Sequence, residues 1–127
     1  MCALQRTRAV EFAEVLASLG CKLVLDNFSL QDGHVELLDL KGLRMLKLHP
    51  LLTSTMAIDT RRQAVVAGIA QMACVLGMYT CAKSIESKQF QPLLAKLKVD
   101  FVQGFAYSVP RPLGELGFGE QAVAAAR

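Results

Sequence analysis

The chain has 127 residues, the length of a single domain, and 53% of them are hydrophobic. A mean hydropathy of +0.35 is high for a free-standing soluble domain, so either the core is large or apolar surface is buried against another molecule. The net charge is only +3, and the basic residues are scattered with few aromatic residues beside them. This composition argues against a protein that binds nucleic acid.

The cysteines and histidines do not form the spacings that metal sites need. The four cysteines contain no C-x-x-C pair; they are Cys2, Cys21, Cys74 and Cys81. We therefore expect free thiols in a reducing compartment. Because His34 and His49 have no ligand-like spacing to the cysteines, we predict neither a metal nor another cofactor.

The first segment, residues 1–20, predicts an amphipathic helix over residues 6–19. Its apolar side chains recur on one side of such a helix; they are Ala9, Phe12, Ala13, Leu16 and Leu19. Gly20 is well placed to end this helix in a left-handed conformation. The segment reaches Glu11 and Glu14 too soon to contain the apolar run of a secretory signal.

Residues 21–109 are predicted to form the main domain, beginning with extended segments. Residues 21–30 are interpreted as a short strand or a packed connection. Residues 34–40 and 43–49 predict two strands joined by a tight hairpin turn at Lys41-Gly42. Pro50 ends the second strand because proline cannot donate a ladder hydrogen bond.

The longest uncharged stretch, residues 64–82, predicts a central helix over about residues 60–83. Such an apolar helix must be enclosed either by protein or by lipid. The stretch is rich in small residues and has Gln71 near its middle, which favours enclosure by protein. A membrane span remains the alternative, because the length fits and arginine or lysine flanks both ends. Asp59 or Thr60 is the expected N-cap.

The last part of the chain predicts a polar linker, a strand and a tail. Residues 84–92 are polar, and residues 93–109 alternate with a period of two over much of their length, which indicates a strand. Residues 110–127 form the predicted C-terminal tail, in which the final alanine run is compatible with a short helix.

This order of elements resembles the hotdog fold of acyl-CoA thioesterases. The stretches that carry the resemblance are IDTRRQAVVAGIAQMA (58–73) and KLKVDFVQGF (96–105). The resemblance implies an α+β fold, in which a curved antiparallel sheet wraps around the long apolar central helix. Only three or four strands can be counted, so we expect an incomplete wrap with the missing wall supplied by another chain.

The resemblance also implies where a thioesterase site would lie. The positions that match the family site are Asp59, Thr60, Gln63, Ala64 and Gln71. Gln71 stands at the position of the catalytic carboxylate, and glutamine cannot act as a general base near neutral pH. Arg61 and Arg62 are either a contact for a CoA phosphate or a solvated helix shoulder.

We therefore expect a catalytically degenerate thioesterase-like protein that is a structural or accessory subunit of a larger complex rather than an enzyme. Its partners would be other proteins in a hetero-oligomer or copies of itself in a homo-oligomer, and a mitochondrial location is favoured over the cytoplasm. The first alternative is an active acyl-CoA thioesterase with an atypical site around Asp59, Arg62 and Gln71. The second alternative is a small membrane subunit with residues 64–82 as its single span.

Overall fold

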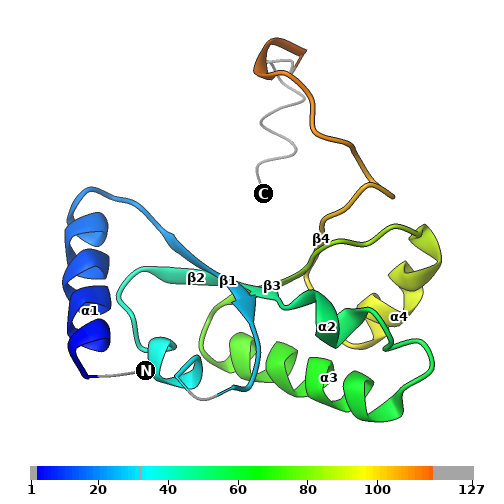
Figure 1. Ribbon diagram of the computed structural model, residues 1–127, viewed down its shortest axis with the longest axis horizontal. Coiled ribbons are helices and arrows are strands. Elements are labelled where there is room, and N and C mark those ends of the chain that lie inside the picture. The colour runs from blue at the N-terminus through cyan, green and yellow to red at the C-terminus, as the bar shows by residue number, and fades with distance from the viewer. Residues whose placement is uncertain (1–2, 32, 116–127) are drawn as a thin grey trace.

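The computed structural model describes residues 3–31 and 33–115 and combines helices with one sheet (Figure 1). The elements in chain order are α1 (Ala3–Ser18), β1 (Leu23–Phe28), η1 (Val35–Leu37), β2 (Leu43–Leu48), α2 (Pro50–Thr53), α3 (Thr60–Val75), β3 (Tyr79–Ala82), η2 (Lys88–Phe90), α4 (Gln91–Lys96), β4 (Phe101–Val102) and η3 (Leu113–Glu115). The predicted terminal alanine helix falls on residues outside the described range.

All strand pairs in the sheet are parallel. The strand order is β1-β2-β3-β4, so each strand lies beside its neighbour in sequence. Parallel neighbours need a crossover connection, and helical segments supply it, most clearly α3 between β2 and β3 and α4 between β3 and β4. The predicted antiparallel hotdog sheet is therefore wrong.

The predicted hairpin does not form. Residues 34–40 contain the short helix η1 and turns instead of a strand, and β2 pairs in parallel with β1 from residues 21–30. Leu38 and Leu40 pack against the core from outside the sheet, which explains the leucine-rich pattern of that segment. Gly42 does have a positive φ of 79°, but its turn leads the chain into β2 rather than folding it back on a preceding strand.

The long apolar stretch at 64–82 is two elements rather than one helix. Helix α3 ends at Val75, Gly77 takes a left-handed φ of 71°, and β3 starts at Tyr79. Both elements pack on the same core, so their sequences are apolar in succession. The predicted central helix starts at Thr60 as expected, but it ends at Val75 rather than near residue 83. In the described part of the chain, no helix combines the length and apolarity of a membrane span.

The predicted strand at 93–109 is mostly helix and turn. Helix α4 occupies Gln91–Lys96, Lys98 has a left-handed φ of 64°, and β4 is confined to Phe101–Val102. Leu97 and Val99 are partly buried against both apolar clusters of the core. Leu97 and Val99 alternate with polar residues as in a strand, but here they lie on either side of the turn at Lys98 that follows α4.

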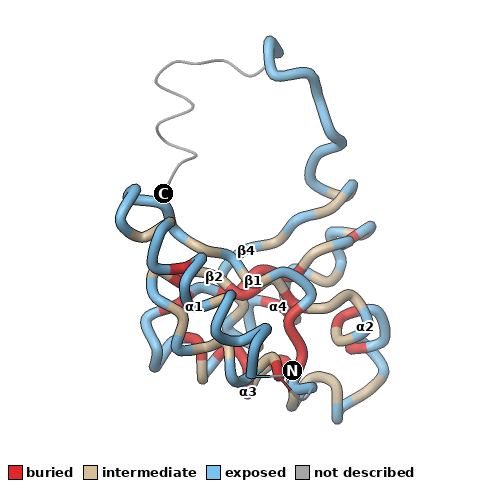
Figure 2. The backbone as a smooth tube through the Cα atoms, turned by 60° about the vertical axis from the view of Figure 1, so that its left-hand side comes forward, coloured by how far each residue is buried: buried red, intermediate tan, exposed pale blue. Residues whose placement is uncertain are grey.

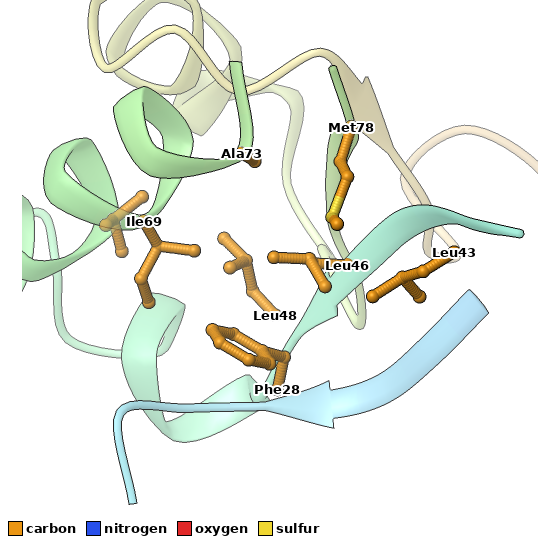
Figure 3. Packing of buried hydrophobic residues seen from close by; sticks show 8 residues of the cluster. Phe28, Leu43, Leu46, Leu48, Ile69, Ala73 and Met78 are labelled. Atoms are coloured by element: carbon orange, nitrogen blue, oxygen red, sulfur yellow. The ribbon is translucent and has the colours of Figure 1, made fainter. Parts of the chain in front are cut away.

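The main core lies between one face of the sheet and α3 (Figure 3). Its buried members are Phe28, Leu43, Leu46, Leu48, Val66, Ile69, Ala73 and Met78. A smaller cluster joins the end of β3 to α4 through Met56, Ala82, Ile85 and Leu94. Because α3 covers a single face of the sheet, the predicted wrapping of the sheet around a helix is wrong as well. Helix α1 is almost wholly exposed (Figure 2).

Candidate functional site

Four polar side chains lie at the carboxyl ends of the four strands. Asp26 is on β1 and Lys47 on β2, whereas Lys83 directly follows β3 and Gln103 directly follows β4. We call these four residues the strand-end row. Parallel strands bring their carboxyl ends to one edge of the sheet, and this edge is where α/β proteins bind ligands. The row is therefore the candidate binding site of the sheet.

An ion pair connects the ends of β1 and β3. The Lys83 ammonium nitrogen Nζ donates a hydrogen bond of 2.7 Å to Oδ1 of Asp26. This hydrogen bond is the largest cause of a lowered pKa at Asp26. The Lys83 side chain is only 17% exposed, whereas that of Asp26 is 59% exposed. The carboxylate therefore holds a partly shielded ammonium group in place.

A second polar contact connects the ends of β2 and β4. Nζ of Lys47 donates to Oε1 of Gln103 over 2.9 Å. The strand order is β1-β2-β3-β4, so both polar contacts reach over an intervening strand. The two contacts thus tie the ends of all four strands into one polar surface.

The register shows which face of the sheet carries the row. Leu46 and Leu48 are buried in the core beside α3, so Lys47 between them points to the opposite face. Lys47 is opposite Cys81 in the β2–β3 ladder, which places the Cys81 thiol on the same face. Burial raises the pKa of the Cys81 thiol, and the Lys47 ammonium partly opposes that effect. The strand-end row therefore lies on the face of the sheet that α3 does not cover.

The charge of the row favours anions. It contains two ammonium groups and one carboxylate, and the carboxylate is already paired with Lys83. A lysine ammonium has three donors, and the printed contact of each lysine uses one of them. The described residues contain no group of three histidine, cysteine, aspartate or glutamate side chains that could hold a metal ion. Phosphate is one of the anions that accept charge-assisted hydrogen bonds from lysine ammonium groups.

A recess of about 250 Å³ opens beside Gln103. It is lined by Ser84, Glu86, Gln103, Gly104 and Phe105. Its backbone is tightly connected, since the Gln103 N–H donates to the Ala82 carbonyl over 2.8 Å and the Ile85 N–H donates to the Gln103 carbonyl over 3.1 Å. Gly104 has a φ of 154°, and a Cβ there would lie 2.2 Å from the Ile85 carbonyl oxygen, so only glycine fits. This packing fixes the backbone of Gln103 at the edge of the recess.

The two histidines have local structural roles near the same edge. Nδ1 of His34 accepts a hydrogen bond of 3.1 Å from the Ser29 N–H, and Nδ1 of His49 accepts one of 3.1 Å from the Leu51 N–H at the start of α2. Ser29 and His49, with Arg62, also line a recess of about 280 Å³ beyond β1 and β2. The two rings thus shape the loops that follow β1 and β2.

The residues predicted as a thioesterase site do not converge. Asp59 is the N-cap of α3 and accepts from the backbone N–H groups of Arg61 and Arg62, which confirms its predicted capping role. Gln71 lies twelve positions further along the helix, a rise of about 18 Å, and its side chain is exposed. It lines a recess between α3 and the turn before β4, together with Cys74 and Lys98.

The other predicted positions surround the start of α3. Arg62 donates to the Leu51 carbonyl and lies 3.6 Å from Asp59. Gln63 donates from Nε2 to the Met56 carbonyl over 2.7 Å. Thr60, Arg61 and Ala64 belong to the exposed or half-exposed first turns of α3. These side chains stabilise the entry to the helix and form no group around a common point.

The sequence analysis did not predict the strand-end row, because each of its residues fits the local pattern of its own segment and none belongs to a recognisable motif. Asp26 follows the apolar run Leu-Val-Leu, Lys47 interrupts a leucine pattern, and Lys83 looks like the charged flank of a long helix. Only a parallel assignment of residues 23–28, 43–48 and 79–82 would have indicated that these three side chains meet.

A comparison with protein families decides the classification. The family model described as EAL domain matches residues 2–110, most of the chain. The chain belongs to the EAL domain family. The solved relatives of the EAL family also identify the fold as a TIM-barrel-type fold with parallel strands.

Individual EAL proteins are similar to this chain over a limited length. The cyclic di-GMP phosphodiesterase PdeB of Shewanella oneidensis is 25% identical over 108 residues, which is 85% of this chain and 13% of PdeB. The probable cyclic di-GMP phosphodiesterase PdeA of Escherichia coli is 26% identical over 102 residues, which is 80% of this chain and 14% of PdeA. The chain thus spans a small part of these curated relatives.

Solved EAL structures give the same picture. The FimX EAL domain of Xanthomonas citri, in complex with cyclic di-GMP, is 26% identical and superimposes with a TM-score of 0.76. The superposition covers 87% of this chain and 44% of that chain. The four strands described above thus correspond to less than half of an EAL domain.

Membership of the EAL family overturns several predictions. The resemblance to hotdog thioesterases was wrong, and with it the accessory subunit, the acyl-CoA ligand and the membrane subunit. The expectation of a protein that is not an enzyme is contradicted by relatives named as cyclic di-GMP phosphodiesterases. The EAL ligand in the FimX structure is a cyclic dinucleotide. The error arose because the strands were predicted to pair antiparallel, and an antiparallel sheet around a helix is the hotdog fold.

Proposed function

We propose that this chain is part of a cyclic di-GMP phosphodiesterase, and that the strand-end row binds a phosphodiester group of the ligand. The observation that carries the proposal is the pair of lysines, Lys47 and Lys83, fixed at the carboxyl ends of neighbouring parallel strands. The membership of the EAL family and the names of the relatives support the choice of substrate.

The two lysines fit a phosphodiester for electrostatic reasons. Asp26 neutralises part of the charge of Lys83 and fixes its position, and Gln103 holds Lys47 through a neutral amide oxygen. The four side chains of the row keep one positive charge in excess, which favours the binding of an anion. Asp26 and Gln103 already orient the two ammonium groups, so the lysine side chains need little rearrangement when the ligand binds.

The same side chains would assist hydrolysis. When water attacks phosphorus and one phosphorus–oxygen bond of the ring breaks, negative charge grows on the phosphoryl oxygens. Fixed cationic donors stabilise this charge more than they stabilise the bound substrate, which lowers the barrier. Asp26, whose pKa is lowered by the hydrogen bond from Lys83, is ionised near neutral pH and serves to position that lysine.

A substitution of either lysine tests the proposal. We expect Lys83→Met and Lys47→Met each to lower the rate of conversion of cyclic di-GMP to the linear dinucleotide at least about tenfold, the effect of losing one charge-assisted contact. Chromatography of the nucleotides measures this rate. Lys41→Met is the matched control, because Lys41 is exposed before β2 at the other end of the strand. Equal rates in all three variants would refute the role of the row, and no turnover by the unaltered chain would refute hydrolysis.

A further inference from the structure

The two histidines of the chain hold the same peptide group at the end of β1. Nδ1 of His34 accepts a hydrogen bond of 3.1 Å from the Ser29 N–H, and the His34 ring lies 6.0 Å from the Phe28 ring, centroid to centroid. The His49 N–H donates to the Phe28 carbonyl over 2.9 Å. The Phe28 ring itself is buried beside Leu48 in the main core (Figure 3). The peptide group between residues 28 and 29 is therefore bound on its N–H side by one histidine and on its carbonyl side by the other.

The His49 ring makes a second hydrogen bond of the same kind. Its Nδ1 accepts from the Leu51 N–H over 3.1 Å, which makes His49 the N-cap of α2. The N–H groups in the first turn of a helix have no partner within the helix, so a capping side chain supplies one. The Leu51 carbonyl accepts in turn from Arg62 of α3. The loop after β2 is thus tied to the start of α2 and, through it, to α3.

Both hydrogen bonds require a neutral imidazole ring. A backbone N–H can only donate, so Nδ1 must supply a lone pair, and the neutral ring then has its proton on Nε2. A second proton turns Nδ1 into a donor, and the hydrogen bond from the N–H is lost. Ser29 is buried, so its N–H would lose its partner at a place with little access to water. The Ser29 hydroxyl oxygen lies 3.3 Å from Nδ1 of His34 and is a ready acceptor for the protonated ring.

The peptide held by the histidines follows directly on the strand-end row. An extra residue in β1 relative to β2 bulges the strand just before this peptide. Asn27 in the bulge has a left-handed φ of 52°, and its N–H donates to Oδ1 of Asp26 over 2.9 Å. Bulges re-aim side chains, so the direction of Asp26 toward Lys83 depends on where β1 is held beyond the bulge. The histidines provide that hold.

The charged groups around the two rings belong to classes that do not titrate near neutral pH. In the described part of the chain, the charged residues on β1, η1, β2 and the start of α3 nearest to the rings are Asp26, Glu36, Lys47, Asp59 and Arg62. Arg62 lines one recess with His49, whereas Lys47 points to the opposite face of the sheet. An unperturbed imidazole titrates at about pH 6.5, well away from carboxylate, ammonium and guanidinium groups. A change of these loops near that pH therefore reports on the histidines.

We propose that His34 and His49 form a proton-sensitive latch on the ends of β1 and β2. Above the pH range in which imidazole takes up protons, both rings accept from backbone N–H groups and the latch is closed. As the pH falls through about 6.5, the protonated rings release the N–H groups of Ser29 and Leu51 and the latch opens. The bulge of β1 then loses its fixed end, and Asp26 loses its fixed position beside Lys83.

Amide hydrogen exchange followed by NMR tests the latch without any ligand. Rates are expressed as protection factors, which remove the intrinsic effect of pH on exchange. In the unaltered chain, the protection of the Ser29 and Leu51 amides should fall at least about tenfold between about pH 7.5 and about pH 5.5, the effect of losing one hydrogen bond. The amide of Ile69, in the buried part of α3, should keep its protection.

His34→Asn and His49→Asn are matched variants, and each is the control of the other. The asparagine side-chain oxygen accepts a hydrogen bond as Nδ1 does but does not titrate. His34→Asn should remove the pH dependence at Ser29 and leave that at Leu51, and His49→Asn should do the reverse. Equal protection at both pH values in the unaltered chain, or a pH dependence at Ser29 that persists in His34→Asn, would overturn the proposal. A loss that extends to Ile69 would overturn it as well, because the whole fold would then be opening.

The consequence of the latch for ligand binding rests on the proposed function. The affinity for cyclic di-GMP should be several-fold lower at about pH 5.5 than at about pH 7.5 in the unaltered chain, and equal at the two pH values when both histidines are replaced by asparagine. Calorimetric titration at each pH measures this difference. Absence of binding at both pH values would refute the proposed function, whereas the exchange experiment decides the latch by itself.

Discussion

At the scale of single residues, the ion pair between Asp26 and Lys83 matters more for the position of the lysine than for the stability of the fold. Exposed ion pairs contribute little to stability, and Asp26 is mostly exposed. The value of the pair lies in position, because it holds an ammonium group at the end of β3. The sequence does not indicate this contact, since the two residues are 57 positions apart. Asp59 is the contrasting case: its capping role is local and was predicted.

The ion pair should make the stability of the fold depend on pH in acid. Lys83 lowers the pKa of Asp26 below its ordinary value of 3.8 in the folded state. The pair therefore stabilises the fold above that pH, and this contribution is lost as the pH falls through the lowered pKa. Urea unfolding should show Asp26→Asn less stable than the unaltered chain near neutral pH, with the two converging in acid. A difference that grows as the pH falls would contradict the assignment.

At the scale of elements, the sequence predicts single segments better than their partners. Helix α1 and strand β2 lie close to the ranges predicted for a helix and a strand. The pairing of β2 was wrong because Gly42 has the positive φ that both a hairpin and a strand entry use. The end of α3 was missed because an apolar strand follows Gly77 with no polar residue between them. Tertiary packing, which local patterns do not contain, decides both cases.

The N-cap of α3 gives a prediction at this scale. Asp59 accepts hydrogen bonds from two backbone N–H groups of the first turn, at 2.9 and 3.3 Å. We expect Asp59→Ala to lower the free energy of unfolding by about 1 kcal/mol, the usual cost of a lost cap. Asp59→Ser is the control and should keep most of the stability, because serine also caps. Chemical denaturation measures both, and an alanine variant as stable as the serine variant would rule out the capping role.

At the scale of the whole molecule, the structure corresponds to less than half of a solved EAL chain. The strand-end row draws on four strands, and its contacts join residues 56 and 57 positions apart. No local motif in the sequence marks it, so the site emerges only with the parallel topology.

Calorimetric titration of cyclic di-GMP into the purified chain tests the central claim most directly. We expect saturable binding that is lost in Lys83→Met and retained in Lys41→Met. No binding by the unaltered chain, or equal binding by Lys83→Met, would contradict the assignment of the strand-end row as the ligand site.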